Sequence, residues 1–201
     1  MSCGRHSENR QVEMTASVDT VDVVQEGKAI THDAFQALSS KLGQAVQEGG
    51  VGYALEFCNV EALPITDSLS ANHGVILRRA SHRPRNQANR AESLEMESIR
   101  QYLSQLQDQK ELKPKVYRDN EQIVYHAPIM INNGLCLNCH GREGSQIQEK
   151  NLELIRQLYP DDEATGFEVG ELRGIWSVKF PKSYFEQDEI KSRGSSDVGE
   201  P

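Results

Sequence analysis

The pentapeptide Cys136-Leu137-Asn138-Cys139-His140 decides the fold, because it matches the pattern C-x-x-C-H and predicts a prosthetic group around which a core can close. Two thiols at this spacing can reach the two vinyl groups on one edge of a porphyrin. The histidine that follows then turns its imidazole beneath the iron, and imidazole is a standard axial ligand of haem iron. The pattern predicts one covalently attached haem, with Cys136 and Cys139 as attachment points and His140 as the proximal ligand.

Three other interpretations of these residues remain open. Zinc would be held by the motif's two cysteines and histidine together with a fourth ligand such as Cys58, although the second ligand pair of a zinc finger is missing from the sequence. A dithiol redox pair is a further option, but no βαβ pattern precedes the motif. A structural disulfide between cysteines this close would be strained. The haem interpretation is therefore preferred.

The size and charge of the chain limit the kinds of function and partner that it can have. The sequence has 201 residues, which predicts one domain, and 37% of them are hydrophobic, so the apolar surface of a haem would enlarge a modest core. The formal net charge is −8, which makes nucleic acid a poor partner because nucleic acid needs a basic face. A cationic redox or signalling protein fits this charge better, although mild acidity also serves solubility alone.

Both ends of the chain are polar and lack periodicity, which predicts a flexible leader over residues 1–28 and a flexible tail over residues 186–201. No stretch approaches the roughly 20 apolar residues of a membrane span, and no export signal is visible. Haem attachment to this motif takes place beyond the bacterial inner membrane, so a periplasmic or other extracytoplasmic location is expected. Cys3 is a candidate for the lipid-modified residue of a trimmed lipoprotein, which would anchor the chain to a membrane; the alternative is an incidental cysteine.

Residues 29–185 mix helical and strand patterns, which predicts an α+β domain with an antiparallel sheet and helices packed on it. Helical patterns cover about 33–48, 64–74, 93–110 and 147–158, and strand patterns cover 75–79, 115–117, 122–127 and 172–180. The haem motif is expected on a loop. In the first helix, the apolar face is expected to consist of Phe35, Leu38, Leu42 and Val46.

One axial position of the iron is left open by the motif. The candidate ligands are Cys58, Met130, Met96, His73, His82, His126 and His32. Met130 lies six residues before Cys136, which makes the opposite haem face awkward to reach. Cys58 is a lone thiol in an apolar run, which is compatible with a ligand and also with an inert buried cysteine. The residues alone leave the choice open.

Several segments in order carry a resemblance to a known family. They are Glu56-Phe57-Cys58, Gly74 to Arg79, Arg85-Asn86 with Asn89, Val124-Tyr125, Cys136 to Gly141, Tyr159-Pro160-Asp161-Asp162, Ala164-Thr165-Gly166-Phe167, and Gly170 to Val178. With these, the chain resembles a family of single-haem c-type cytochromes with a PAS-like fold. That family includes a small cyanobacterial haem protein and extracytoplasmic sensor regions of bacterial histidine kinases. The resemblance spans roughly residues 30–181.

The resemblance implies specific roles for three more residues. Cys58 matches the family's distal cysteine, which implies His/Cys axial ligation. Arg79 and Arg85 are the best matches to an arginine near the haem propionates. The sequence departs from the family at Gln87, where a proline usually follows the Arg-Asn pair.

These inferences favour a non-enzymatic haem protein that senses redox state or a small gas. A thiolate donor stabilises ferric iron, so reduction should weaken the bond to Cys58 and admit CO or NO. Simple electron transfer is the alternative, and it needs no change of ligand. Catalysis on an open haem ranks last, because only His126 offers itself as a distal acid–base group.

Overall fold

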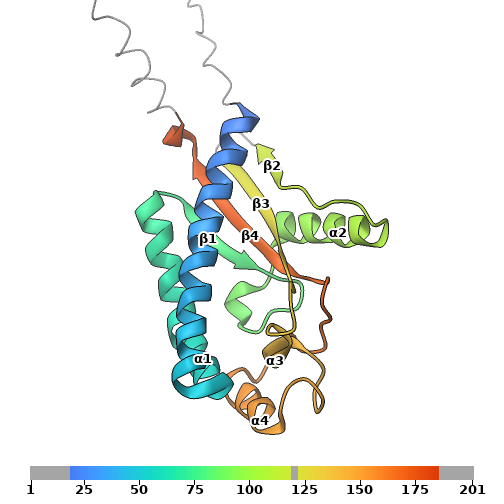
Figure 1. The fold of residues 1–201 in the computed structure, drawn as a ribbon. Helices are drawn as coiled ribbons and strands as arrows, with labels where there is room; N and C mark the ends of the chain where they lie inside the picture. Colours follow the sequence, from blue (N-terminus) through green and yellow to red (C-terminus); the bar gives the residue numbers. More distant parts are fainter. Residues whose placement is uncertain (1–18, 119–121, 186–201) are drawn as a thin grey trace, which may run out of the picture.

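The computed structural model describes residues 19–118 and 122–185 of the chain. Its centre is a four-stranded antiparallel sheet with the spatial order β1-β4-β3-β2 (Figure 1). The strands are β1 (Ile76–Ala80), β2 (Lys115–Arg118), β3 (Gln122–Met130) and β4 (Leu172–Pro181). The helices are α1 (Thr20–His73), α2 (Ser93–Gln107), α3 (Leu137–His140) and α4 (Glu149–Leu158), with short 3-10 turns at Gln87–Asn89 and Lys182–Tyr184. The expected α+β, PAS-like architecture is confirmed.

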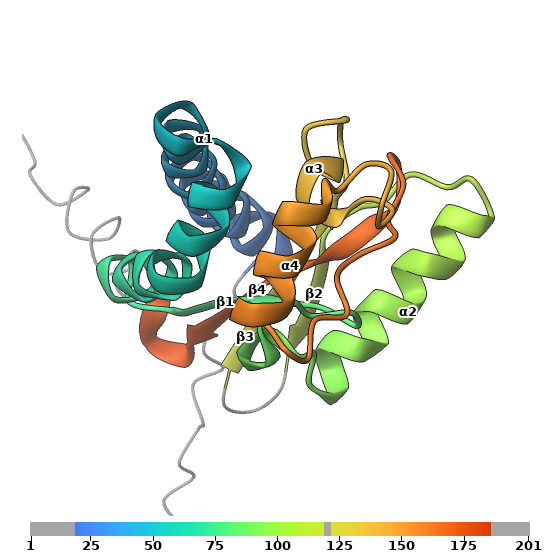
Figure 2. The same ribbon diagram turned by 90° about the horizontal axis from the view of Figure 1, so that it is seen from below.

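Helices cover both faces of the sheet (Figure 2). On one face, Val23, Ile30 and Ala34 of α1 pack against strand residues such as Val178 and Phe180. On the other face, Ile99 and Tyr102 of α2 pack against a second cluster. That cluster includes Ala80, Leu172 and Ile175. Because β4 is a central strand with helices on both sides, seven of its ten residues are buried.

The first helix differs from the sequence-based expectation at its start. It begins at Thr20, where the Asp19 side chain accepts a hydrogen bond from the Val21 N–H (2.9 Å), so residues 20–28 are helical and do not belong to a leader. Residues 1–18, which include Cys3, and the expected tail at 186–201 lie outside the described residues.

The expected buried face of this helix is wrong except at Leu38, which packs against the core. Phe35, Leu42 and Val46 are between 38% and 53% exposed, and the sheet is covered by a face that includes Val23 and Ile30. Close packing explains why this face of α1 meets the sheet. A Cβ on Gly27 would lie only 2.4 Å from the Tyr125 ring, so this glycine lets the helix approach the sheet.

The helical run changes direction at Gly50, whose φ of 75° and ψ of −169° are non-helical. The predicted stop at Gly49-Gly50 is therefore confirmed. Beyond it, the chain forms one continuous helix to His73 in place of a separate short helix that opens at Pro64. The ring of Pro64 removes one backbone hydrogen bond without ending the helix, and Gly74 caps it with a left-handed φ of 64°.

The remaining boundaries shift by a few residues. Strand β1 runs one residue later than expected, α2 ends at Gln107, and β3 continues to Met130. The haem motif forms the short helix α3 and is not a loop. Within the part of the chain that the structure describes, no helix has the length and apolar character needed to cross a membrane.

His126 ties α2 to the sheet through a buried hydrogen-bond network. Its side chain is fully buried in β3, with Nδ1 at 2.7 Å from Ser98 Oγ and Nε2 at 3.1 Å from Ser177 Oγ. The Tyr117 hydroxyl lies 2.8 Å from the same Ser98 oxygen. Burial lowers the pKa of His126 to about 4. The residue therefore stays neutral in the folded protein and serves packing.

We expect this histidine to make stability depend on pH. In the unfolded chain the imidazole takes up a proton near pH 6.5, whereas the folded protein resists protonation until about pH 4. The free energy of unfolding should therefore fall on acidification through this window, by about 2 kcal/mol between about pH 7 and about pH 5. Urea unfolding at both pH values checks this. The His126→Gln variant should lose this part of the pH dependence, and an unchanged dependence would contradict the assignment.

Candidate functional site

A pocket of about 290 Å³ opens between the second half of α1, the end of the sheet and α3. Apolar side chains form much of its wall, and none of the described residues that line it is Asp or Glu. All six site residues expected from the sequence line it: Cys58, Arg79, Arg85, Cys136, Cys139 and His140. The structure therefore gathers, from four separate segments, the residues that the sequence analysis singled out.

The haem motif lines the pocket through one turn of helix. The turn is closed by the His140 N–H, which donates to the Cys136 carbonyl at 3.0 Å. Residues three and four positions apart share a face of a helix, so Cys136, Cys139 and His140 all line the pocket. Just before the turn, the Asn133 side chain accepts a hydrogen bond from the Leu135 N–H at 2.9 Å, which sets the entry of the chain.

The loop that contains Ala164 fixes the orientation of the His140 ring. Nδ1 of the imidazole lies 2.8 Å from the carbonyl oxygen of Ala164, a geometry in which Nδ1–H donates and Nε2 keeps its lone pair for a ligand. Burial holds the pKa of His140 well below its usual value, with Arg173 and Arg85 lowering it further. A neutral imidazole of this tautomer is the form that binds a metal.

Two sulfur-containing residues line the same pocket from other elements. Cys58 comes from α1, and Met130 comes from the end of β3. Burial raises the pKa of the Cys58 thiol, while Arg79 and Arg85 oppose that rise. The sequence predicts that Met130 is poorly placed as a ligand, yet this residue lines the pocket, while its side chain also packs against the α2 cluster.

The other candidate ligands lie elsewhere in the fold. Met96 packs in the α2 cluster, and His126 is held between two serines. His73 lies 3.5 Å from the Asp33 carboxylate, and His32 contacts Gln36 on the surface. Neither these residues nor His82 lines the pocket. The structure therefore reduces the candidates for a second ligand to Cys58 and Met130.

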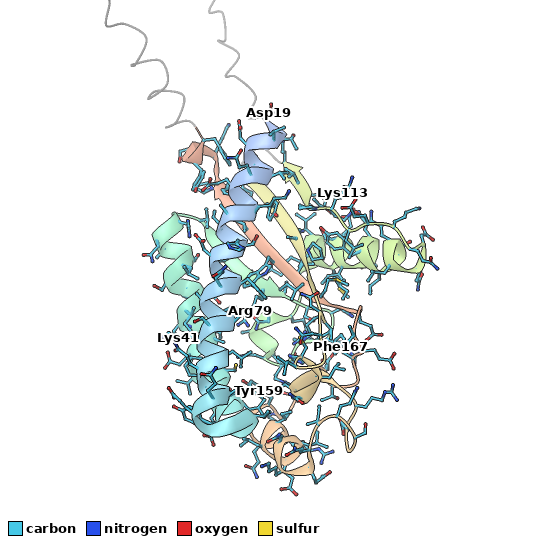
Figure 3. The ribbon with its side chains drawn as sticks, in the orientation of Figure 1. Asp19, Lys41, Arg79, Lys113, Tyr159 and Phe167 are labelled. Carbon is cyan, nitrogen blue, oxygen red and sulfur yellow. The ribbon has the colours of Figure 1, made fainter. Side chains whose placement is uncertain are left out.

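Three arginines give the pocket an excess of positive charge. Arg79, Arg85 and Arg173 all line it, and Figure 3 shows Arg79 in the space between α1 and α3. The Nε atoms of Arg79 and Arg173 are buried without a hydrogen-bond partner. Burial and the neighbouring Arg85 lower the pKa of Arg173 to about 9, with Asp162 acting in the opposite direction. Buried cations with unsatisfied donors indicate an anionic ligand.

Arg173 is the residue that sequence reasoning missed. The signal was available: a guanidinium stands in the mostly apolar strand Leu172–Phe180, and charged residues seldom lie inside such a strand without a partner. Tyr159 was noted only as part of a matching segment, and it too lines the pocket. Burial raises the pKa of its hydroxyl to about 12, so it is a neutral hydrogen-bonding group.

Arg85 has a second role, which is structural. Its guanidinium pairs with the Asp162 carboxylate at 3.1 Å and donates to the Cys139 carbonyl at 2.7 Å. Both partners of the ion pair are nearly buried. Arg85 therefore fastens the haem-motif turn to the loop after α4, and much of its donor capacity is used by the protein itself.

Comparisons with known proteins found a matching family and a similar solved structure. A family model described as Tll0287-like matches residues 7–181. Among solved structures, the crystal structure of the cyanobacterial haem protein Tll0287 is similar, with a TM-score of 0.56 and 24% sequence identity over 81% of this chain and 94% of that one. No curated protein matches the sequence. The structural similarity supports the PAS-like fold.

We expect the Asp162→Asn substitution to lower the free energy of unfolding by about 3 kcal/mol, because it leaves the Arg85 charge nearly buried and unpaired. Asparagine keeps an oxygen that can accept the Ala164 N–H, so the change tests the charge. Asp108→Asn is the control, since the Lys110–Asp108 pair is exposed and should cost about 0–1 kcal/mol. Equal losses in urea unfolding would contradict the structural role of Arg85.

Proposed function

The chain belongs to the Tll0287-like family, and on this premise we propose that it binds one c-type haem in the pocket, attached to Cys136 and Cys139 and ligated by His140. The observation that carries the proposal is the Cys-x-x-Cys-His turn at the pocket wall, with the Nε2 of its histidine free for a ligand. The relative whose crystal structure is similar is a haem protein.

The donor set fits a haem better than a zinc ion. In residues 19–118 and 122–185, no group of three or more His, Cys, Asp or Glu side chains converges as a metal-ion site. A haem needs at most two protein donors, since its macrocycle provides the other four. The buried Arg79 and Arg173, whose Nε atoms have no partner, offer donors to the two propionates. Apolar residues such as Leu55 and Ile131 offer contacts to the ring.

The two cysteines would act as nucleophiles toward the vinyl groups. Each thiol adds across one vinyl double bond, so that a carbon–sulfur bond forms and the thiol hydrogen ends on the neighbouring carbon. The addition consumes no oxidant. Burial raises the pKa of Cys139 to about 11, so this thiol is protonated at neutral pH.

Cys58 is the distal ligand in this proposal. Metal coordination requires the thiolate, and Arg79 and Arg85 favour that charged form against the cost of burial. A bound haem would supply one-electron redox chemistry and one exchangeable coordination position. On reduction, Cys58 would take up a proton and leave the iron, which would open that position to CO or NO. Release of Cys58 would free the second half of α1, which is the basis for a redox or gas sensor.

The remaining parts of the proposal concern location and partners. Haem attachment to a C-x-x-C-H motif takes place outside the cytoplasm, so we expect the protein in the periplasm or an equivalent compartment. A lipid on Cys3 would hold it at a membrane. A cationic redox or signalling protein suits its net charge of −8. Electron transfer without ligand exchange is the second candidate function.

Covalent attachment is the first prediction to test. Protein expressed with export and haem-attachment machinery should keep its haem after denaturation and acidic organic extraction. The Cys136→Ser/Cys139→Ser double variant should release essentially all of it, because no thioether can form. Cys58→Ala is the matched control and should retain the haem covalently. A colourless unaltered protein, or one whose haem is extracted freely, would contradict the proposal.

The distal ligand can be tested in the same holoprotein. We expect Cys58→Ala to abolish the low-spin, thiolate-type ferric spectrum and to raise the reduction potential, because a thiolate stabilises ferric iron. The shift should be at least tenfold in the redox equilibrium, or about 59 mV for one electron. Met130→Leu is the control, since it removes the other sulfur of the pocket and should leave the spectrum unchanged.

The outcomes separate the two candidate functions. CO uptake by the reduced unaltered protein would support ligand exchange. Coordination that stays the same in both oxidation states and ignores CO would favour electron transfer. A ferric spectrum that is unchanged in Cys58→Ala and altered in Met130→Leu would replace Cys58 by Met130 as the ligand.

A further inference from the structure

The segment Ala164-Thr165-Gly166-Phe167 pairs with the end of the haem motif. The Gly166 N–H donates to the Gly141 carbonyl at 2.7 Å, and the Phe167 N–H donates to the His140 carbonyl at 2.8 Å. These two bonds join stretches that are some two dozen residues apart in the sequence. They lock the backbone of His140 against the segment, so a movement of one requires a movement of the other.

The same segment holds the His140 ring in two different ways. The Ala164 carbonyl oxygen lies 2.8 Å from Nδ1 and fixes one edge of the imidazole. The Phe167 ring meets the imidazole almost perpendicularly, at an interplanar angle of 86° with the ring centroids 6.3 Å apart. The hydrogen bond sets the tautomer, and the ring contact limits rotation of the imidazole about its own axis.

Phe167 is itself firmly held. Its side chain is 1% exposed, and the guanidinium carbons of Arg83 and Arg173 lie 4.1 Å and 5.5 Å from its ring centroid. Arg83 also donates to the carbonyls of Glu163 and Thr165, on either side of Ala164. Arg83 therefore braces both the aromatic ring and the backbone that carries the accepting carbonyl.

We propose that residues 164–167, braced by Arg83, form a clamp that fixes the orientation of the His140 imidazole ring in the pocket. Phe167 is then a positioning residue that tunes the reduction potential. The inference rests on the proposed haem site. Groups behind a metal-ligating histidine set its orientation and its basicity, and both influence the relative stability of ferric and ferrous iron. A single held orientation also gives a single ferric signal in electron paramagnetic resonance.

A packing role alone would predict something different. Phe167 belongs to a small cluster with Ile131 and Ala164, so its truncation would lower stability even if it never influenced the histidine. Phe180 provides the matched control, because it is fully buried in the cluster under α1 and does not line the pocket. Phe167→Leu and Phe180→Leu each remove one phenyl ring, but from two different hydrophobic clusters.

The experiment compares the holoproteins by urea unfolding, by redox titration and by electron paramagnetic resonance of the ferric form. Both variants should unfold more easily. Only Phe167→Leu should broaden or split the ferric signal and shift the redox equilibrium at least threefold, which is about 28 mV for one electron. Arg83→Lys keeps the charge but removes the planar brace, and it should move the ferric signal in the same direction as Phe167→Leu.

Two results would overturn the clamp. One is a potential and a ferric signal in Phe167→Leu that match those of the unaltered protein, as they should in Phe180→Leu. The other applies if Phe167→Leu does not accumulate. In that case, an Arg83→Lys holoprotein whose ferric signal and reduction potential are unaltered would also contradict the clamp. Failure of the proposed function is distinguishable, because then the unaltered protein itself would carry no covalent haem, and the clamp would fall with it.

Discussion

The site depends on the contacts of the Arg85 guanidinium, because they join three segments that lie far apart in the sequence. It donates to the Cys139 carbonyl within the haem motif and pairs with the carboxylate of Asp162. Asp162 in turn accepts the Ala164 N–H at 2.9 Å and so shapes the loop whose carbonyl meets His140. A planar fork with several donors can hold a carboxylate and a carbonyl together, which an ammonium group does less well. The turn of α3 therefore has a fixed position relative to the sheet.

Charge in this molecule is divided between its surface and its pocket. The chain as a whole is acidic, with a net charge of −8, yet three arginines line the pocket and none of the described lining residues is acidic. Burying Arg79 and Arg173 costs free energy that the two unpartnered Nε atoms do not recover. An anionic ligand would offset that cost, so the pocket is better suited to a carboxylate-bearing group than to an uncharged one.

The proximal and distal sides of the pocket are built with different rigidity. His140 is held by a backbone carbonyl, a perpendicular aromatic ring and paired backbone groups. Cys58 lies on a helix that follows the break at Gly50 and contains Pro64. Arg79, which also lines the pocket, donates only a long hydrogen bond of 3.4 Å to Ala62. If both residues bind the iron as proposed, a firmly held His140 and a less constrained Cys58 would suit exchange of the second ligand.

Local patterns in the sequence determined the elements and the chemistry of the site. The C-x-x-C-H motif, the alternation of Trp176, Val178 and Phe180, and the Gly49-Gly50 stop could all be recognised without a structure, because each depends on neighbours along the chain. The start of α1 and its buried face could not. Phe35, Leu42 and Val46 have the helical spacing of a core stripe, but the close approach at Gly27 turned a different face to the sheet. Likewise, only the tertiary structure brought Arg173 and Met130 to the pocket, set Arg85 against Asp162 and placed Phe167 beside His140. These are contacts between distant segments, and their energies depend on burial and distance, which no local pattern contains.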